Sequence, residues 1–421
     1  KYHSLTVRLR MQNNTMKMKT TVSLLTGFFV SVGVSAMSAK PPTDPITEFQ
    51  NSWTGKALAH QRDLDVNAPM INNNILGSHN TYNSKVYQTA IRYIDPQQKY
   101  SIYDQLRIGA RFIELDAHWS AQTHGNVWDW GPGLLLCHSG IGASMGDLHV
   151  GCSLTDRFVK DGMGEVAQFL NENSEEVIIL YIEDHTDGRH AELLAVLNET
   201  LGEKIYPSNG CNNIPDSLTK AQIREAGKQI VLWKDGGCSA NSDMSQLAFT
   251  GLGNIERIWE DQTSVGAIGA FFTGGSVDKI STADVTQVFK NGGNIINLDN
   301  LTYSDGRIAA GIWSWDVNEP NNYANNQDCA VQKGNGRWDD AHCAGIKHVA
   351  CKANDGRWAI SRTMATWLLA PAACDLLGAS YEFSVPTNSQ DNEALKAVKG
   401  GIANVWLNAS DRHSEGHWVA H

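Results

Sequence analysis

The chain has 421 residues, of which 42% are hydrophobic, and a formal net charge of −11. This length allows one large domain and a smaller one. Acidic residues outnumber basic ones by 45 to 34, and no basic run follows the N-terminal segment, which disfavours nucleic-acid binding through a charged face. An acidic protein can still use a metal ion to bind a phosphate group.

The N-terminal segment has the composition of an export signal. Two lysines precede an apolar run over residues 22–34, and small residues follow that run. This order is typical of a signal peptide, here cleaved after Ala36 or Ala39, and the run is short for a transmembrane helix. We therefore expect residues 1–39 to be a leader, the protein to be secreted or periplasmic, and no segment to span a membrane.

Eight cysteines in an exported chain predict disulfides. None of them lies in a CxxC or CxxH pair, so we expect no zinc site. The positions are Cys137, Cys152, Cys211, Cys238, Cys329, Cys343, Cys351 and Cys374.

Short apolar, β-branched segments alternate with helical or polar stretches between about residues 71 and 316. Eight strands with intervening helices over this length predict an α/β fold, a (β/α)8 TIM barrel spanning residues 40–317. A doubly wound sheet is the alternative, but no glycine-rich phosphate loop of the Rossmann or P-loop type supports it. The expected strands cover residues 72–79, 110–119, 134–140, 176–185, 229–236, 266–274, 294–300 and 309–316.

Oxygen-bearing side chains cluster at the ends of these strands. Asn80 follows the first, Glu114 and Asp116 lie in the second, and Glu183 is near the end of the fourth. Because the C-terminal strand ends of a barrel share one mouth, we expect the four side chains to converge. Neighbouring carboxylates repel unless a cation or proton lies between them, and an all-oxygen set favours Ca²⁺ over Mg²⁺. For any one residue an ordinary polar strand end is the simpler explanation; for all four together it is not.

Two histidines complete the set, His79 after the first strand and His138 in the third. His79 alone would more readily be a packed structural histidine. As a pair, one histidine could take a proton from an attacking hydroxyl and the other could protonate the leaving oxygen. A metal ion beside them would neutralise a phosphoryl oxygen, so the set predicts cleavage of a phosphodiester.

The motifs GSHNTY, GARFIELDAHW, LLLCHSG and VIILYIEDH, in this order, resemble the catalytic X region of calcium-dependent phosphatidylinositol-specific phospholipase C. The resemblance covers about residues 70–235, and its extension to residue 316 is an expectation. It implies a phospholipid substrate at a membrane surface. The inositol 2-hydroxyl would attack phosphorus to give diacylglycerol and a cyclic inositol phosphate. By the same resemblance His79, His138 and Glu114 are catalytic, and Asn80, Glu114, Asp116 and Glu183 are Ca²⁺ ligands.

This chain departs from that family in several places. After Asp116 the family often has Trp-Asp-Gly, where this chain has AHWSAQTHG, and CHSG replaces the usual His-Gly-His-Thr. Lys234 only loosely matches a lysine-bearing strand that meets additional phosphates, so we expect no preference for polyphosphorylated lipids. Lys234 and Trp315 are the expected substrate-binding residues, although core packing is an equal alternative for a tryptophan at that position.

The last hundred residues, 318–421, predict a small α+β subdomain. The order Glu-Pro-Asn, Cys, Trp-Asp-Asp and two further Cys in residues 318–351 resembles the second half of a C-type lectin-like domain. Residues 366–419 resemble the first half, so the halves are in swapped order, as in a circular permutation.

The lectin-like resemblance has two implications. It pairs Cys329 with Cys343 and Cys351 with Cys374, and proximity then suggests Cys137–Cys152 and Cys211–Cys238. A second calcium ion and a sugar could also bind, although these residues would more readily serve only to shape the turn and the core. The residues of this second site are Glu319, Asn321, Asp339 and Asp340.

Two other functions remain open. A related barrel phosphodiesterase could act on glycerophosphodiesters or sphingomyelin, but the glycerophosphodiesterase pattern has Arg after the first histidine, where this chain has Asn80. A non-catalytic glycan-binding protein on a barrel scaffold is the third reading, and the complete histidine pair argues against it.

Overall fold

The computed structural model describes residues 44–87, 96–126, 129–138, 143–145, 148–150, 152, 156–236, 242–258 and 280–421, and the structural statements below concern these residues. The expected leader, residues 1–39, and the expected strand at 266–274 lie outside them. Within the described ranges, no helix has both the length and the apolar character that crossing a membrane requires.

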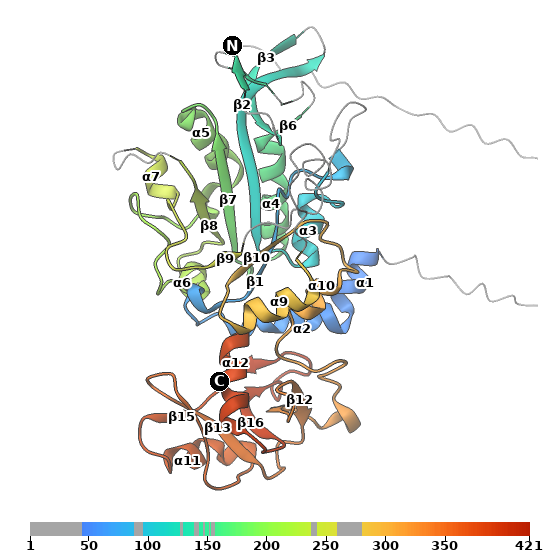
Figure 1. Ribbon diagram of the computed structural model, residues 1–421, viewed down its shortest axis with the longest axis vertical. Coiled ribbons are helices and arrows are strands. Elements are labelled where there is room, and N and C mark those ends of the chain that lie inside the picture. The colour runs from blue at the N-terminus through green and yellow to red at the C-terminus, as the bar shows by residue number, and fades with distance from the viewer. Residues whose placement is uncertain are drawn as a thin grey trace, which may run out of the picture. The chain divides into compact units, whose positions relative to one another are not determined.

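A parallel sheet forms the larger part of the fold (Figure 1). Its strands follow the order β8–β7–β2–β1–β10–β9, and each neighbouring pair is parallel. The central residues of these strands are mostly Ile, Leu and Val and are buried, as a sheet covered on both faces requires. Expected strands at 72–79, 110–119, 176–185, 229–236 and 294–300 are confirmed. The strands are β1 (Ile75–Ser78), β2 (Phe112–Asn126), β7 (Ile178–His185), β8 (Ile230–Lys234), β9 (Arg257–Ile258) and β10 (Ile295–Leu298).

This sheet curls. In the described chain β8 and β9 lie at opposite ends of the strand order, yet the guanidinium of Arg257 on β9 is 5.4 Å from the ring centroid of Trp233 on β8. Five strand spacings in a flat sheet would separate its edges by roughly 24 Å. The sheet is therefore a curled half-barrel, and a complete ring of eight parallel strands is not present among the described residues.

The third expected strand belongs to a hairpin and not to the parallel set. β3 (Asp129–Leu136) runs antiparallel to β2, with Leu136 opposite Ala117, and β6 (Arg157–Phe158) pairs antiparallel with β3. The short strands β4 (Ala143–Met145) and β5 (Leu148–Val150) form a separate antiparallel pair. The prediction of a parallel strand at 134–140 was wrong because apolar patterning reports burial and not chain direction.

The prediction of an eighth strand at residues 309–316 is also wrong. The helix α10 (Gly306–Ala310) takes up its start, and the following residues are held by other partners. Gln61 Oε1 accepts hydrogen bonds from the backbone N–H groups of Trp313 (2.7 Å) and Ser314 (3.1 Å), and Trp338 N–H donates to the Ser314 carbonyl (2.9 Å). The segment therefore joins the C-terminal sheet, while β1 and β10 pair directly with each other.

Helices pack their apolar stripes on the strands. In α4 the residues Val159, Met163, Val166 and Phe169 recur every three or four positions, are buried, and belong to one core cluster with outward-facing residues of β2. The other helices are α1 (Pro45–Asn51), α2 (Trp53–Leu64), α3 (Ile102–Ile108), α5 (His190–Thr200), α6 (Lys220–Glu225), α7 (Met244–Leu247), α9 (Thr282–Lys290), α11 (Ala370–Asp375) and α12 (Ser389–Lys399), and α4 itself spans Val159–Glu172.

A second, seven-stranded sheet is built from the C-terminal residues. Its strand path is β12–β11–β16–β13–β14, with β15 on β13 and β17 on β16. Tryptophans fill the core of this sheet together with residues from α2. The strands are β11 (Cys329–Gln332), β12 (Trp338–Ala341), β13 (His348–Ala353), β14 (Trp358–Ile360), β15 (Tyr381–Phe383), β16 (Val405–Ser410) and β17 (Val419–Ala420).

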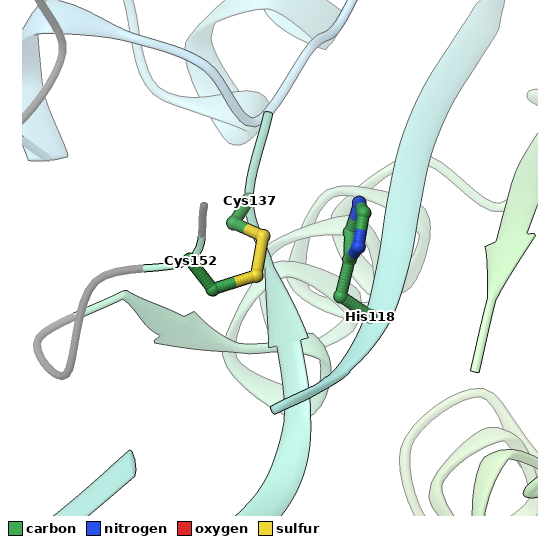
Figure 2. Close-up of side chains that lie close together, drawn as sticks. All are labelled: His118, Cys137 and Cys152. Atoms are coloured by element: carbon green, nitrogen blue, oxygen red, sulfur yellow. A yellow bond between two sulfur atoms is a disulfide. The ribbon is translucent and has the colours of Figure 1, made fainter. Parts of the chain in front are cut away.

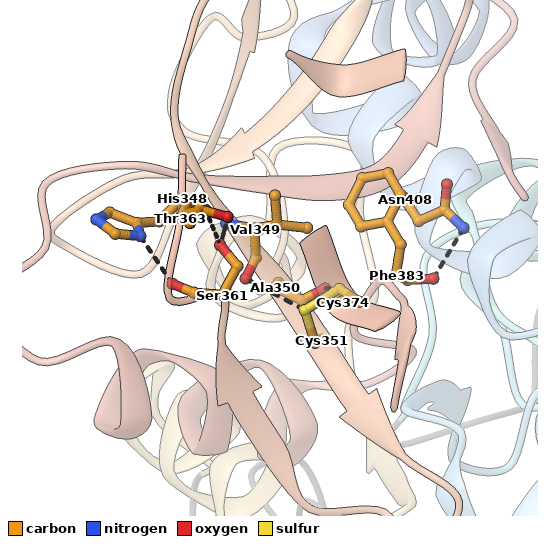
Figure 3. The surroundings of a disulfide bond; sticks show 9 residues. All are labelled: His348, Val349, Ala350, Cys351, Ser361, Thr363, Cys374, Phe383 and Asn408. Atoms are coloured by element: carbon orange, nitrogen blue, oxygen red, sulfur yellow. Dashed lines mark hydrogen bonds between the residues drawn. A yellow bond between two sulfur atoms is a disulfide. The ribbon is translucent and has the colours of Figure 1, made fainter. Parts of the chain in front are cut away.

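Disulfides agree with the predicted pairs wherever both cysteines are described. The bonds Cys137–Cys152, Cys329–Cys343 and Cys351–Cys374 are present. Figure 3 shows the last of these, which joins β13 to α11, together with the hydrogen bond from Asn408 Nδ2 to the Phe383 carbonyl (3.0 Å). Cys211 is disulfide-bonded, and its predicted partner Cys238 lies outside the described residues. These bonds are consistent with an extracytoplasmic location.

Candidate functional site

Three carboxylates lie together on one face of the parallel sheet. Glu114 and Asp116 are two residues apart on β2, and Asp116 is paired in register with Glu183 on β7. One oxygen from each of the three lies within 4.8 Å of the others. Glu114 and Asp116 are buried and Glu183 is partly exposed. The structure thus brings together three of the four expected metal ligands.

The carboxylates of this cluster have pKa values shifted in different directions. Burial and then the charges of Glu183 and Glu114 raise the pKa of Asp116 well above its usual value. In contrast, the pKa of Glu183 is lowered, chiefly by a hydrogen bond from His185, whose Nε2 is 2.8 Å from Glu183 Oε1. Carboxylates that share a site repel one another, which disfavours ionisation of the most buried one. A divalent cation between them would remove that repulsion.

Asn80, the fourth expected ligand, borders the cluster. It follows β1 with φ at 43°, in the left-handed region that Asn adopts more easily than most residues. The next residue locks this turn to β2, because Thr81 N–H donates to the Glu114 carbonyl and Thr81 Oγ1 accepts from Glu114 N–H, both at 3.0 Å. The Asn80 amide consequently lies 3.1 and 3.2 Å from the two oxygens of Asp116 and 3.1 Å from His79 Nε2.

The orientation of this amide depends on what lies beside it. With its nitrogen toward Asp116, Asn80 donates a hydrogen bond to that carboxylate. With its oxygen toward Asp116, oxygen faces oxygen, and only a cation between Asn80 and Asp116 would make the contact favourable. The position therefore serves equally as a hydrogen-bond donor or as an oxygen ligand.

His79 forms a buried pair with Asp299. Its Nδ1 lies 2.8 Å from Asp299 Oδ1, and Asp299 has no exposed surface. The carbonyl of His79 accepts a hydrogen bond from Gln98 Nε2 at 2.7 Å, which fixes the backbone beneath the ring. Because Asp299 holds the proton on Nδ1, Nε2 is left with its lone pair and can accept a proton. Asp299 was not predicted as a site residue. It directly follows β10, just as His79 directly follows β1.

His138 reaches the same site from the hairpin. Two residues before it, Leu136 is opposite Ala117 of β2, so the chain leaves β3 beside the carboxylates. Burial and then the charge of His79 lower the pKa of His138, while the charge of Glu183 opposes that effect. His138 follows a strand that pairs directly with β2, which carries Glu114 and Asp116.

A disulfide holds the chain next to His138. Figure 2 shows the Cys137–Cys152 bond beside the ring of His118 on β2. His118, Cys137 and Cys152 have donor atoms close together, but the two sulfurs are bonded to each other and are not thiolate ligands. His118 stacks on His185 of β7 with ring centroids 4.5 Å apart. His118 and His185 thus lie two residues beyond Asp116 and Glu183, on the same face of β2 and β7.

Two further side chains orient the carboxylates. Tyr82 Oη donates to Asp116 Oδ2 at 2.7 Å, and Asn297 Nδ2 donates to Glu114 Oε2 at 2.8 Å. Asn297 is in register with Gly77 on β1, where a Cβ would collide with the Asn297 side chain. Neither residue was predicted as part of the site. Their only sequence sign was their position in or directly after an expected strand.

The ammonium group of Lys234 already contacts three oxygen atoms of the protein. Lys234 is 3% exposed, and its ammonium lies 2.6 Å from Asp184 Oδ2, 2.9 Å from the Asp235 carbonyl and 3.3 Å from that of Gly236. This arrangement favours a structural role at the end of β8 over the expected contact with substrate.

For Trp315 the structure favours core packing, the alternative that the sequence left open, over contact with substrate. Trp315 is 1% exposed and packs against Trp338 and Trp418 in the core of the C-terminal sheet. Residues 311–316 form no strand of the parallel sheet and lie beside β12.

A second acidic cluster lies in the C-terminal part. Glu319, Asp339 and Asp340 place one oxygen each within 4.8 Å of the others. Burial and then the charge of Asp339 raise the pKa of Glu319 to about 8. Asn321, expected with them, donates its N–H to Asp340 Oδ1 at 3.2 Å. Lys333 lies 3.7 Å from Asp339 and 2.7 Å from Asp316, so a cation of the protein is already present at one side.

Comparison with known proteins finds a similarity in the first part of the chain. Residues 43–252 match the family described as the Rv2075c PI-PLC-like domain. This range supplies Asn80, the carboxylate cluster and His138, but not Asp299. A protein described as "Uncharacterized protein Rv2075c", from Mycobacterium tuberculosis, is 27% identical over 402 residues, covering 85% of this chain and 80% of the relative.

Solved phospholipases are similar only at low identity. The phosphatidylinositol-specific phospholipase C from Listeria monocytogenes is 17% identical, with a TM-score of 0.37, over 60% of this chain and 97% of that protein. A calcium-dependent phosphoinositol-specific phospholipase C from the Gram-negative bacterium Pseudomonas sp. is 11% identical, with a TM-score of 0.28, over 58% and 93% respectively.

Proposed function

We propose that this protein is an exported, calcium-dependent phosphodiesterase that cleaves phosphatidylinositol-type lipids to diacylglycerol and a cyclic inositol phosphate. One arrangement carries the proposal: the carboxylate cluster lies beside the His79–Asp299 pair and within charge range of His138. The match of residues 43–252 to a PI-PLC-like domain supports phosphodiester chemistry.

The residues present fit a calcium ion. Asn80, Glu114, Asp116 and Glu183 would hold it, because a set of carboxylate and amide oxygens suits Ca²⁺. The raised pKa of Asp116 and the two possible orientations of Asn80 are both properties that a cation at this place would resolve. A bound Ca²⁺ would neutralise a phosphoryl oxygen and favour ionisation of the attacking hydroxyl. Glu114 has Asn297 and Arg257 as neighbours, so we assign it to the metal and not to proton transfer.

The histidines divide the proton transfers. His79 accepts the proton of the inositol 2-hydroxyl at Nε2, while Asp299 keeps Nδ1 protonated and the ring oriented. The hydroxyl oxygen attacks phosphorus and the bond to diacylglycerol breaks. His138 gives its proton to the departing oxygen. Water could then open the cyclic phosphate by the reverse transfers.

The remaining parts of the proposal concern location and the C-terminal residues. Residues 1–39 are assigned as leader and signal peptide, and residues 40–317 as the catalytic domain, which meets its lipid as a peripheral protein. Residues 318–421 are assigned as a permuted C-type lectin-like subdomain. In its favour, β13 and β14, which lie at the junction of the two swapped halves, form an antiparallel pair. Glu319, Asn321, Asp339 and Asp340 would bind a second calcium ion and a glycan.

The first experiment measures release of soluble inositol phosphate from phosphatidylinositol vesicles, with calcium and with chelator. We expect calcium-dependent release by the wild type and its loss in His79→Ala. The matched control is His190→Ala, because His190 also contacts an aspartate, Asp184, at 3.0 Å but outside the carboxylate cluster; it should retain release.

Absence of release from folded wild-type protein would remove the inositol-lipid assignment. Glycerophosphodiesters and sphingomyelin would then be tested with the same variants. If no phosphodiester is cleaved while glycan binding is retained, the protein is a binding protein and the catalytic assignment is wrong.

A further inference from the structure

Arg257 lies against the carboxylate cluster although nothing assigns it a role. Its Nη1 is 3.8 Å from Glu114 Oε1, and the two side chains are 10% and 2% exposed. The same guanidinium lies 5.5, 5.2 and 5.4 Å from the ring centroids of Phe112, Tyr181 and Trp233. Arg257 comes from β9, which lies beyond the range matched to the PI-PLC-like family.

The three rings hold this positive charge in place. They belong to the neighbouring strands β2, β7 and β8, and Tyr181 stacks on Trp233 at 3.9 Å with an interplanar angle of 20°. Aromatic faces attract a guanidinium, more strongly when water is excluded. Arginine does not lose its proton in proteins. A permanent cation therefore stays beside Glu114 whether or not a metal ion is bound.

Each carboxylate of the cluster has a different partner. Arg257 Nη1 lies 3.8 Å from Glu114, Tyr82 Oη donates to Asp116 Oδ2 at 2.7 Å, and His185 Nε2 lies 2.8 Å from Glu183 Oε1. Without such partners, three carboxylates within 4.8 Å would repel one another. The arginine therefore stabilises the metal-free site, but the same charge repels a divalent cation bound to Glu114.

We propose that Arg257 is a built-in counter-ion of the cation site. As a positioning residue, it reduces the repulsion between the carboxylates when no metal is bound, and it lowers their affinity for calcium. This inference rests on the proposed calcium site. The consequence is a preformed site that binds calcium reversibly and only at higher concentrations, in place of one that holds the ion permanently.

A purely structural Arg257 makes a different prediction. It would contribute the same stability with and without calcium, as any buried ion pair in the core does. A counter-ion contributes more stability without calcium than with it, because bound calcium itself neutralises the carboxylates.

The experiment compares Arg257→Gln, Arg257→Lys and a control, Arg111→Gln. Arg111 is matched because it is buried, contacts Glu176 at 2.6 Å and lies 4.9 Å over the Phe169 ring, away from the carboxylate cluster. The melting temperature is measured in chelator and across a calcium chloride series, and the calcium Kd by calorimetry.

We expect Arg257→Gln to melt lower than the wild type in chelator, to gain more from calcium, and to bind it with a Kd at least about tenfold lower. Arg257→Lys, which keeps the charge, should stay near the wild type. Arg111→Gln should melt lower with and without calcium and keep the wild-type Kd.

An unchanged or higher Kd in Arg257→Gln overturns the inference while leaving the calcium site intact. A wild-type protein that shows neither a calcium-dependent melting shift nor heat of binding overturns the calcium site and the inference with it. If Arg257→Gln does not fold, Arg257→Met provides the same comparison, because it fills the space between the rings without charge.

Discussion

Replacement of Asp299 by Asn tests whether its pairing with His79 organises the proton transfers. Asp299 is fully buried, and its Oδ1 accepts from His79 Nδ1 at 2.8 Å. Asparagine has the same shape but can donate its own N–H to Nδ1, which moves the ring proton to Nε2 and blocks the base. General-base catalysis contributes about 10²–10⁴-fold, so we expect kcat to fall by that factor, equivalent to about 2.7–5.4 kcal/mol in the barrier.

The assay is the initial rate of inositol phosphate release from phosphatidylinositol vesicles at saturating calcium, with melting temperature and calcium Kd measured alongside. Asp391→Asn is the control, because Asp391 is largely buried and contacts Lys352 Nζ and Trp358 Nε1 in the C-terminal part. It should lower the melting temperature and leave kcat unchanged. A kcat for Asp299→Asn within about threefold of the wild type, or about 0.7 kcal/mol, would refute the reasoning.

Three other changes test the supports of the site and the second cluster. Cys152→Ser removes the disulfide between Cys152 and Cys137, which directly precedes His138 and lies 15 residues earlier, so we expect about 3 kcal/mol less stability by denaturant titration and a lower kcat; an unchanged kcat would contradict the positioning of that histidine. Gly77→Ala places a Cβ against Asn297, and should cost about 1–3 kcal/mol and weaken calcium binding measured by calorimetry. Glu319 has a folded pKa of about 8, above its ordinary 4.5, so it stabilises the fold as the acid and destabilises it as pH rises through that range. Glu319→Gln should therefore raise the melting temperature relative to the wild type near pH 9 and not near pH 5; equal differences at both would contradict this sign.

Local patterns were sufficient to find most of the parallel strands. Each of these segments is short, β-branched and buried on both faces, and such a run has few alternatives to a central strand. The same patterns failed at residues 134–140 and 309–316. In the first case the apolar run is real but antiparallel, and in the second Gln61 and Trp338 take the hydrogen bonds that a barrel neighbour would have provided.

The sequence by itself determined which groups could do the chemistry. The spacing of Glu114 and Asp116 puts them on one side of any strand. Two of the three observed disulfides were predicted from the lectin-like resemblance and the third from proximity. Only the tertiary structure decided the partners of the site residues. Asp299 lies 220 residues after His79 and Arg257 lies on a strand that follows both β2 and β7, and curling of the sheet brings them beside His79 and Glu114. Such pairings depend on strand order and curvature, which are collective properties of the packed sheet and are not encoded in the spacing of any one segment.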